Sequence, residues 1–283
     1  MDKDKKALTL FLVIIAVLSI AVETVWIIGG ETATQAGISS VLMMSPLAAA
    51  IIVSFRYYKK QGALGLRKCK PRFILLSVSI PLAYLLSSYG LYWVFNKDSL
   101  SFSFTVLIEA AAAYSGRDLP DNIAIAISLA VMVPGSILTA FGEEVGWRGF
   151  MYPIMQRLWG FKKAIILSCT TWAVWHLPII VAGLYYPPEM SLLFVIPLFI
   201  VEVLALTVII TWLRMKSNSV WPAILFHAAH NYFDQVVFQS MTSGVNSAYF
   251  VGEIGIITLT ITVIAAILIL VRDVKVFDSN TEA

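Results

Sequence analysis

Long runs of apolar residues, separated by short polar segments, dominate the pattern along this chain. Each run is close to the roughly 20 residues that an α-helix needs to cross a hydrocarbon core of about 30 Å. The runs lack the polar–apolar alternation of a membrane barrel, so the predicted fold class is an all-α polytopic membrane protein. Eight spans are predicted, the fourth continuing as helix to about Leu158: 7–29, 39–56, 73–95, 122–145, 163–184, 191–213, 220–238 and 250–271.

Composition supports the membrane class. The chain is 59% hydrophobic and only 13% charged, whereas soluble domains carry about 25% charged residues. The first apolar run, 7–28, is too long for the core of a signal peptide, so it is predicted to be a membrane helix. Cys69 and Cys169 lie far apart and are interpreted as ordinary free thiols. No internal repeat or linker is visible, so 1–283 is predicted to be one domain.

Basic residues predict the orientation. In the eight-span drawing only Lys97 and Arg117 fall on one side. By the positive-inside rule, both termini are predicted to lie in the cytoplasm of a multi-pass cell-membrane protein. The net charge of +3 therefore reflects topology, and no nucleic-acid partner is expected. The other 18 basic residues share the opposite side: Lys3, Lys5, Lys6, Arg56, Lys59, Lys60, Arg67, Lys68, Lys70, Arg72, Arg148, Arg157, Lys162, Lys163, Arg214, Lys216, Arg272 and Lys275.

The segment 99–121 is too short and too polar for a ninth span. It is predicted to be an interfacial or re-entrant helix on the outer side of the membrane. Glu109 within it is interpreted as an exposed polar residue.

Ionisable residues at membrane depth are costly and commonly mark functional sites. The first cluster is 141-FGEEVGWRGF-150. On a helix Glu144 and Arg148 are four residues apart and can form an ion pair. Glu143 is rotated by about 100° from Glu144, so it stays outside the pair. A purely structural alternative is a buried ion pair with a spare carboxylate at a helix end.

The second cluster is 171-TWAVWHLP-178, with His176 in mid-span and Trp172 one turn earlier on the same face. The structural alternative for His176 is a histidine that bonds to a backbone carbonyl. Trp172 and Trp175 are more often packing or interface residues than catalytic ones.

The third cluster is 226-FHAAHNYFD-234, in which His227 and Asn231 share one helical face. Alanines between His227 and His230 allow another helix to approach closely. His230 is one residue off that face, so it serves either the same cavity or a bond to a neighbouring helix. Asp234 is predicted to reach the interface at the outer end of its span.

Together the clusters suit hydrolysis. A glutamate or histidine can take a proton from water, and a histidine and an asparagine amide can donate hydrogen bonds to an oxyanion. A proton-coupled transporter could use the same groups, but it predicts internal repeats that the sequence lacks. Glu202 is a further intramembrane acid without an evident partner.

Three short motifs resemble those of a known family. EEVGWR fits E-E-x-x-x-R, WAVWH is similar to F-x-x-x-H with Trp172 at the aromatic position, and HAAHN fits H-x-x-x-N. In this order and spacing, over about 123–271, they resemble the CPBP family of intramembrane proteases, also called the Abi or CAAX-protease family.

The resemblance implies an eight-helix fold with a catalytic cavity open towards the cytoplasm, and endoproteolysis without an acyl-enzyme. In its CAAX branch the substrate is a prenylated C-terminal peptide, while bacterial relatives have other substrates or roles near bacteriocin immunity. The resemblance implies six roles: the general base Glu143, His176 on the catalytic water, the oxyanion donors His227 and Asn231, and the supporting pair Glu144 and Arg148.

Two alternatives stay open. Glu143, His176 and His227 could form a zinc site, although no H-E-x-x-H motif occurs and Asn231 is a poor zinc ligand. We favour a mechanism without metal or other cofactor, because it gives every motif residue a role. A non-catalytic scaffold or immunity-type protein of the same fold is the second alternative, against which the retained motif residues argue. The expected partners are the bilayer and a peptide or prenylated protein substrate.

Overall fold

A computed structural model describes residues 2–29, 35–59, 64–187, 190–244 and 246–278 of the chain. The predicted all-α class is confirmed, and one isolated bridge between Leu100 and Thr242 is the only β pairing among the described residues. The helical segments are α1 (Asp2–Gly29), α2 (Gln35–Tyr57), α3 (Pro71–Phe95), η2 (Lys97–Ser99), α4 (Thr105–Ser115), α5 (Asp121–Glu144), η3 (Val145–Met151), α6 (Tyr152–Val181), α7 (Leu192–Ser217), α8 (Trp221–Asn231), η4 (Tyr232–Phe238), η5 (Gln239–Met241), η6 (Ser247–Tyr249) and α9 (Ile256–Asp278).

Within the described residues, six helical runs are long and apolar enough to cross a membrane, against the eight predicted. One of them, Asp121–Val181, is 61 residues long and contains predicted spans four and five. These two spans meet at Gly160, whose φ of 74° and ψ of 169° break the helix. Predicted span seven is present as α8 followed by η4. Helix α8 has 11 residues and η4 has 7, so each alone is too short to cross a membrane.

The last span begins later than predicted. The sequence suggests helix from residue 250, whereas α9 begins at Ile256. Gly252 has a φ of 93°, a left-handed conformation that glycine adopts without a steric penalty and that ends helical geometry. As a result, Glu253 lies in a turn rather than on a membrane helix.

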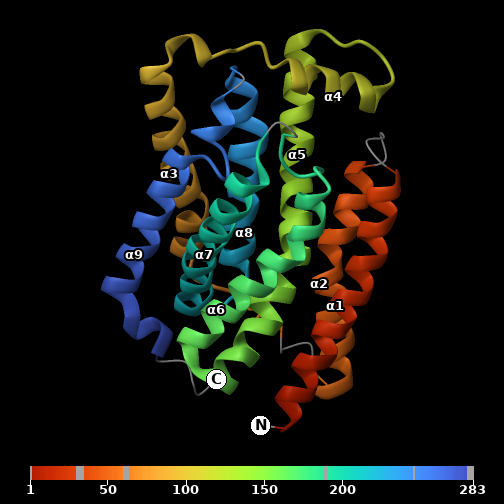
Figure 1. The fold of residues 1–283 in the computed structure, drawn as a ribbon, viewed down its shortest axis with the longest axis vertical. Helices are drawn as coiled ribbons and strands as arrows, with labels where there is room; N and C mark the ends of the chain where they lie inside the picture. Colours follow the sequence, from red (N-terminus) through yellow and green to blue (C-terminus); the bar gives the residue numbers. More distant parts are fainter. Residues whose placement is uncertain (1, 30–34, 60–63, 188–189, 245, 279–283) are drawn as a thin grey trace.

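The start of α1 and the end of α9 lie at the same end of the molecule (Figure 1), as an even number of crossings requires. The predicted cytoplasmic location of this end stays a prediction. Lys60, one of the basic residues used for that prediction, lies outside the described residues.

The 99–121 segment lies at the opposite end, where it forms η2 and the short helix α4 (Figure 1). The Ser128 hydroxyl on α5 donates a hydrogen bond of 2.7 Å to the Leu107 carbonyl and so ties α4 to α5. A short helix lying beside a spanning helix agrees with the predicted interfacial element, although its depth in a membrane stays a prediction.

Helices α5 to α8 form the middle of the bundle. Helix α8 packs against α3, α5 and α7, while α1 pairs with α2 and α7 pairs with α9. Figure 1 shows α1 and α2 on one side and α3 and α9 on the other. Residues from the three sequence clusters therefore lie on inner elements of the bundle.

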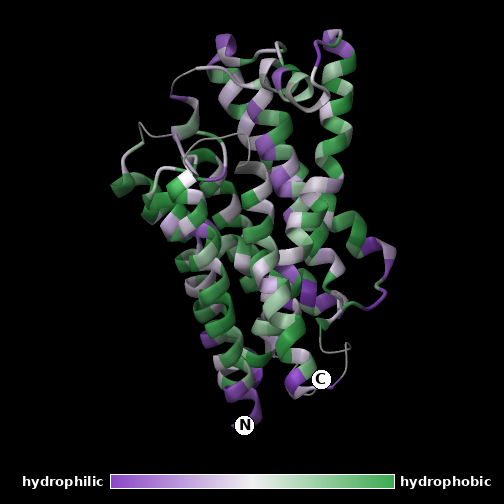
Figure 2. Cartoon of the chain, turned by 90° about the vertical axis from the view of Figure 1, so that its right-hand side faces the viewer, coloured by the Kyte–Doolittle hydropathy of each residue, from purple (hydrophilic) through white to green (hydrophobic). Residues whose placement is uncertain are grey.

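The outer surface of the long helices is apolar. Large side chains such as Ile28, Leu75, Leu193 and Val271 point outward and are exposed. Figure 2 shows apolar residues along the helices and hydrophilic residues gathered towards the ends of the molecule. Contiguous apolar surface of this extent is rare on soluble monomers but is expected where helices face lipid.

Two glycines allow α5 and η3 to lie close to α2. A methyl group on Gly142 would overlap the backbone of Met43, and one on Gly146 would overlap Pro46. Small residues at such positions let membrane helices gain van der Waals contact, which is the main attraction between helices in lipid. The close approach fixes the position of Glu143 and Glu144, which lie between the two glycines in the sequence.

Gly146→Ala is expected to lower the free energy of unfolding by about 1–3 kcal/mol, because the added methyl group overpacks the contact with Pro46. The measurement is the midpoint of thermal unfolding in detergent. Gly135→Ala on α5 is the matched control, since its methyl group would meet nothing within 4 Å. Equal unfolding midpoints for the two variants would contradict the importance of this packing.

Candidate active site

Glu144 and Arg148 form a buried ion pair where α5 ends. Arg148 Nη1 donates to Glu144 Oε1 at 2.8 Å, and both side chains are fully buried. Arg148 Nη2 also donates to Thr207 Oγ1 of α7 at 3.2 Å. The structure thus contains the pair that the helical spacing predicts. Each charge alone would be costly at this depth, so the two residues stabilise each other there.

The helix changes its geometry next to the predicted site residues. The π-helix η3 begins directly after Glu144, and a second π-helix, η4, begins directly after Asn231. Short π-helical segments inside α-helices are rare and are frequently found at functional sites. Both changes were invisible in the sequence pattern.

Glu143 lies outside the ion pair, as its rotation on the helix predicts. Its Oε2 accepts a hydrogen bond of 2.9 Å from the indole Nε1 of Trp172. The Arg148 guanidinium lies over the same indole, 4.2 Å from the ring centroid. Trp172 therefore orients the Glu143 carboxylate as well as packing. A phenylalanine at position 172 could not donate this bond.

Two histidines have one ring nitrogen fixed by a partner. His176 Nδ1 lies 3.0 Å from the Trp172 carbonyl oxygen, and His227 Nδ1 lies 2.9 Å from Glu144 Oε1. Both partners are acceptors, so each Nδ1 carries the hydrogen and donates it. The contact of His176 is the backbone bond of the structural alternative, yet it leaves Nε2 available for chemistry. The same holds for Nε2 of His227.

A small cavity of about 60 Å³ joins the predicted residues. This space is large enough for one or a few water molecules, and polar side chains line it. The structure thus brings Glu143, His176, His227 and Asn231 to one place, from α5, α6 and α8. The cavity is lined by Met43, Glu143, Trp172, His176, Tyr185, Phe199, Val203, Leu206, His227, His230, Asn231, Gln235 and Glu253.

His230 satisfies both of its proposed roles. It lines the cavity, and its Nδ1 forms a hydrogen bond with the hydroxyl of Tyr84 on α3. Its Nε2 is buried and has no hydrogen-bond partner among the described residues.

Glu253 is a cavity residue that the sequence analysis missed. It accepts a hydrogen bond of 3.3 Å from the Tyr186 hydroxyl, and burial raises the pKa of its carboxyl group to about 7. One feature of the sequence could have drawn attention to Glu253. It is an acidic residue between two glycines, in 252-GEIG-255, directly before the last apolar run. This pattern matches none of the motifs considered, so only the tertiary structure reveals that Glu253 lines the cavity.

Two other acids differ from their predicted surroundings. Asp234 was expected at the membrane interface, but it is fully buried, and its Oδ1 accepts a 2.8 Å hydrogen bond from Tyr89. The prediction was wrong because α3 covers this face of η4. Glu202, which had no evident partner, accepts a 2.5 Å hydrogen bond from Thr262 of α9.

A larger cavity of about 540 Å³ adjoins the small one. The two share Met43, Tyr185, Gln235 and Glu253. The larger cavity is lined mainly by the segments 184–190 and 234–254. These segments connect α6 to α7 and η4 to α9, at the end of the bundle opposite to the start of α1 and the end of α9. The predicted opening towards the cytoplasm stays a prediction, and the position of this larger cavity does not support it.

The residues of the zinc alternative, Glu143, His176 and His227, line the same cavity. No group of three His, Cys, Asp or Glu side chains in the described ranges is arranged to hold a metal ion. In the set Glu143, His176 and His227, one oxygen of the glutamate accepts from Trp172. The choice between the zinc alternative and the metal-free mechanism stays a prediction.

Comparison with known proteins points to one family. Residues 125–233 match the family model described as Rce1-like, type II CAAX prenyl endopeptidase. The matched segment contains Glu143, His176, His227 and Asn231, but it ends before Glu253.

A curated relative gives the same indication. Over 95 residues the chain is 35% identical to CAAX prenyl protease 2 of Methanococcus maripaludis. This stretch is 32% of the present chain and 35% of that protein, so the alignment spans about a third of the relative.

Proposed function

We propose that the chain is an intramembrane endopeptidase, on the premise that residues 125–233 match the Rce1-like CAAX prenyl endopeptidase family model. It hydrolyses a peptide bond with a water molecule that Glu143 and His176 activate. Glu144 and Arg148 support the site, and no metal or other cofactor takes part.

The observation that carries this proposal is the shared cavity. Glu143, His176, His227 and Asn231 are separated by up to 88 positions along the chain, yet they line one small space. The space is enclosed by apolar and aromatic side chains, which strengthen electrostatic interactions inside it. A general base, a water partner and oxyanion donors in one enclosure are the groups that amide hydrolysis needs.

In the first step the water oxygen attacks the carbonyl carbon of the scissile bond. Glu143 accepts the proton that the water loses, and Nε2 of His176 accepts a hydrogen bond from the second water hydrogen. Trp172 holds one oxygen of Glu143, leaving the other for the water. The carbonyl oxygen becomes the oxyanion of a tetrahedral intermediate.

The oxyanion is stabilised by the side-chain amide of Asn231 and by Nε2 of His227. Because Nδ1 of His227 already donates to Glu144, Nε2 can donate as well only when the ring carries both protons. In that state two positive groups, Arg148 and His227, balance the carboxylates of Glu143 and Glu144. The cluster is then neutral overall, which suits its burial in a membrane.

In the second step the tetrahedral intermediate collapses and the C–N bond breaks. Glu143 returns its proton to the departing amine nitrogen, so the carboxylate is regenerated. The products are a new carboxyl terminus and a new amino terminus, and no covalent enzyme intermediate forms.

The proposed substrate class is taken from the matched family. We assign to this chain the C-terminal processing of a prenylated protein, in which the lipidated cysteine becomes terminal. The matched family and the name of the archaeal relative support this assignment. A location in the membrane brings the site to a substrate whose lipid is anchored there.

The test is cleavage of a fluorogenic farnesylated CAAX peptide by the purified protein, beside the same peptide without its lipid. Cleavage that requires the farnesyl group would support both the activity and the substrate class. Cleavage of a membrane-peptide library but not of the CAAX peptide would support the proposed protease activity and contradict the proposed substrate class. No cleavage of either would favour the non-catalytic scaffold.

A strong zinc chelator added to the same assay tests the metal-free mechanism. We expect unchanged activity, because the proposed steps use only side chains. Loss of activity that added zinc restores would overturn the mechanism.

Trp172→Phe is expected to lower kcat by about tenfold, since it removes one hydrogen bond to the charged Glu143. The pH profile of kcat is expected to shift, because the carboxylate loses a donor that stabilises its charged form. Trp175→Phe is the matched control, as its indole bonds to Ser19 instead. A pH profile identical to that of the wild type would show that Trp172 only packs.

A further inference from the structure

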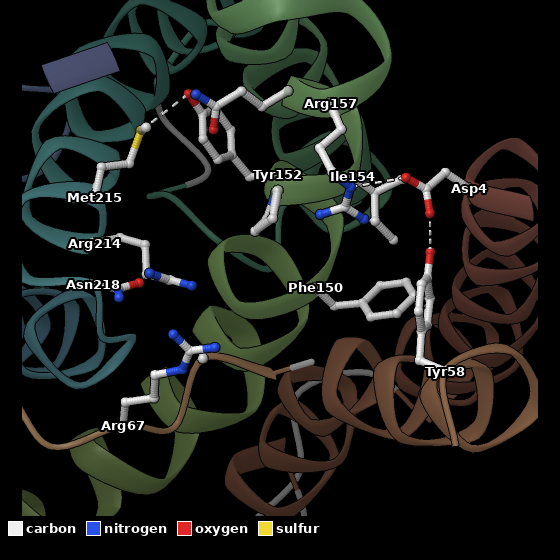
Figure 3. A pocket seen from close by; sticks show the side chains of 13 residues that line it. Asp4, Tyr58, Arg67, Phe150, Tyr152, Ile154, Arg157, Arg214, Met215 and Asn218 are labelled. Carbon is white, nitrogen blue, oxygen red and sulfur yellow. Dashed lines mark hydrogen bonds and ion pairs between the residues drawn. The ribbon is translucent and has the colours of Figure 1, made fainter. Parts of the chain in front are cut away.

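A third cavity, also lined by polar residues, lies at the end of the molecule where the described chain begins. It has a volume of about 390 Å³, and Figure 3 shows Arg67, Arg157 and Arg214 around it. Its lining shares no residue with the cavity that holds Glu143. It is therefore separate from the candidate active site.

One carboxylate, Asp4, lines this cavity, and both of its oxygens are engaged. Arg157 Nε donates to Asp4 Oδ2 at 2.9 Å, and the Tyr58 hydroxyl donates to Asp4 Oδ1 at 2.5 Å. Asp4 thus balances the charge of Arg157. Among the described residues Arg67 and Arg214 have no carboxylate partner.

Arg214 is the more unusual of the two. Its Nε is buried and has no hydrogen-bond partner in the described part of the chain. Arg67 lies close enough to repel it, and Figure 3 shows both guanidinium groups beside the same open space. Two neighbouring positive charges with an unpaired buried donor are unfavourable without an anion between them.

The backbone around the two arginines is fixed. The Gly65 carbonyl accepts a 2.9 Å hydrogen bond from the Val220 amide, and the Arg67 carbonyl accepts a 2.5 Å bond from the Ser219 hydroxyl. Gly65 has a φ of 67°, and a methyl group on it would overlap the Arg214 guanidinium. The segment after α2 is thus held tightly against the end of α7.

The geometry points to a binding site for a phosphate group between Arg67 and Arg214. Guanidinium groups match phosphate oxygens with paired hydrogen bonds, and they do so better than lysine. The volume of the cavity is within the range of small-molecule binding sites, and the apolar side chains of Phe150 and Ile154 line part of it. The phosphate comes either from a phospholipid headgroup or from a free phosphate compound, since both carry this group.

The first experiment measures the binding of two probes to purified, delipidated protein in a zwitterionic detergent. One arm titrates phosphatidylglycerol in mixed micelles, and the other titrates inorganic phosphate at constant ionic strength. Arg67→Gln and Arg214→Gln are compared with the wild type. Arg72→Gln is the matched control, because it removes one exposed positive charge in the same basic segment but does not line the cavity.

We expect each cavity variant to raise Kd by about tenfold, the loss of one charge-assisted interaction, and the control to leave Kd unchanged. Binding of phosphatidylglycerol alone identifies a lipid headgroup as the source, and binding of inorganic phosphate identifies a free compound. Absence of binding in both arms overturns the site. An equal loss in Arg72→Gln also overturns it, because binding would then reflect only general surface charge.

A second measurement needs only the wild type, so it is informative even where a variant fails to fold. Phenylglyoxal modifies accessible arginines, and mass spectrometry of peptides reports each position. The bound probe is expected to protect Arg67 and Arg214 several-fold and to leave Arg72 unprotected. Equal modification of all three arginines with and without the probe would contradict the proposal.

Discussion

Replacing Glu143 by glutamine is expected to lower kcat for peptide cleavage by about 10²–10⁴-fold, the usual contribution of a general base. Glutamine keeps the size of the side chain and can still accept the Trp172 hydrogen bond, but it cannot take a proton from water. KM is expected to change little, because the carboxylate acts in the transition state rather than in substrate binding. The measurement is steady-state cleavage of the farnesylated peptide.

Glu202→Gln is the matched control for this experiment. Glu202 is also a fully buried glutamate on an inner helix, but it bonds to Thr262 and does not line the cavity. Its variant is expected to retain wild-type kcat. If both variants lose activity to the same extent, the effect of Glu143 is a general consequence of changing a buried acid.

Arg148→Met is expected to lower the free energy of unfolding by about 3–5 kcal/mol, the cost of leaving one partner of a buried ion pair unpaired. The charge of Glu144 would then be balanced only through its contact with His227. The methionine keeps most of the volume of the arginine, so a cavity contributes little to the loss. Chemical or thermal unfolding in detergent measures the change.

The double variant Glu144→Gln with Arg148→Met separates charge from packing. Neutralising Glu144 removes the unpaired charge while keeping an acceptor for His227, so we expect it to recover a large part of the lost stability. A double variant that is less stable than Arg148→Met alone would show that packing around Arg148, rather than its charge, holds this region together.

The membrane helices could be predicted from the sequence because lipid imposes one simple rule, a long apolar run. The breaks at Gly160 and Gly252 were harder to place, since each depends on the backbone conformation of a single glycine. The ion pair of Glu144 and Arg148 could be predicted because the two residues are four positions apart in a continuous helical run, where α5 passes into η3.

Contacts between distant elements could not be predicted in the same way. The bond from Trp172 to Glu143 and the bond from Tyr84 to His230 join residues 29 and 146 positions apart. Their formation depends on how the helices pack, and no local pattern records it. Glu253 was missed for the same reason, because it reaches the cavity from a turn outside every motif.

The order in which the cavity is completed along the chain has a consequence for synthesis. Asn231 follows Glu143 and His176 in the sequence and is therefore synthesised after them, and Glu253 comes later still. A nascent chain, or a product truncated before residue 231, therefore lacks part of the cavity and has no oxyanion donor at Asn231. If the proposed mechanism holds, proteolytic capacity would appear only after synthesis has passed residue 231, so shorter nascent chains would not cleave neighbouring membrane proteins.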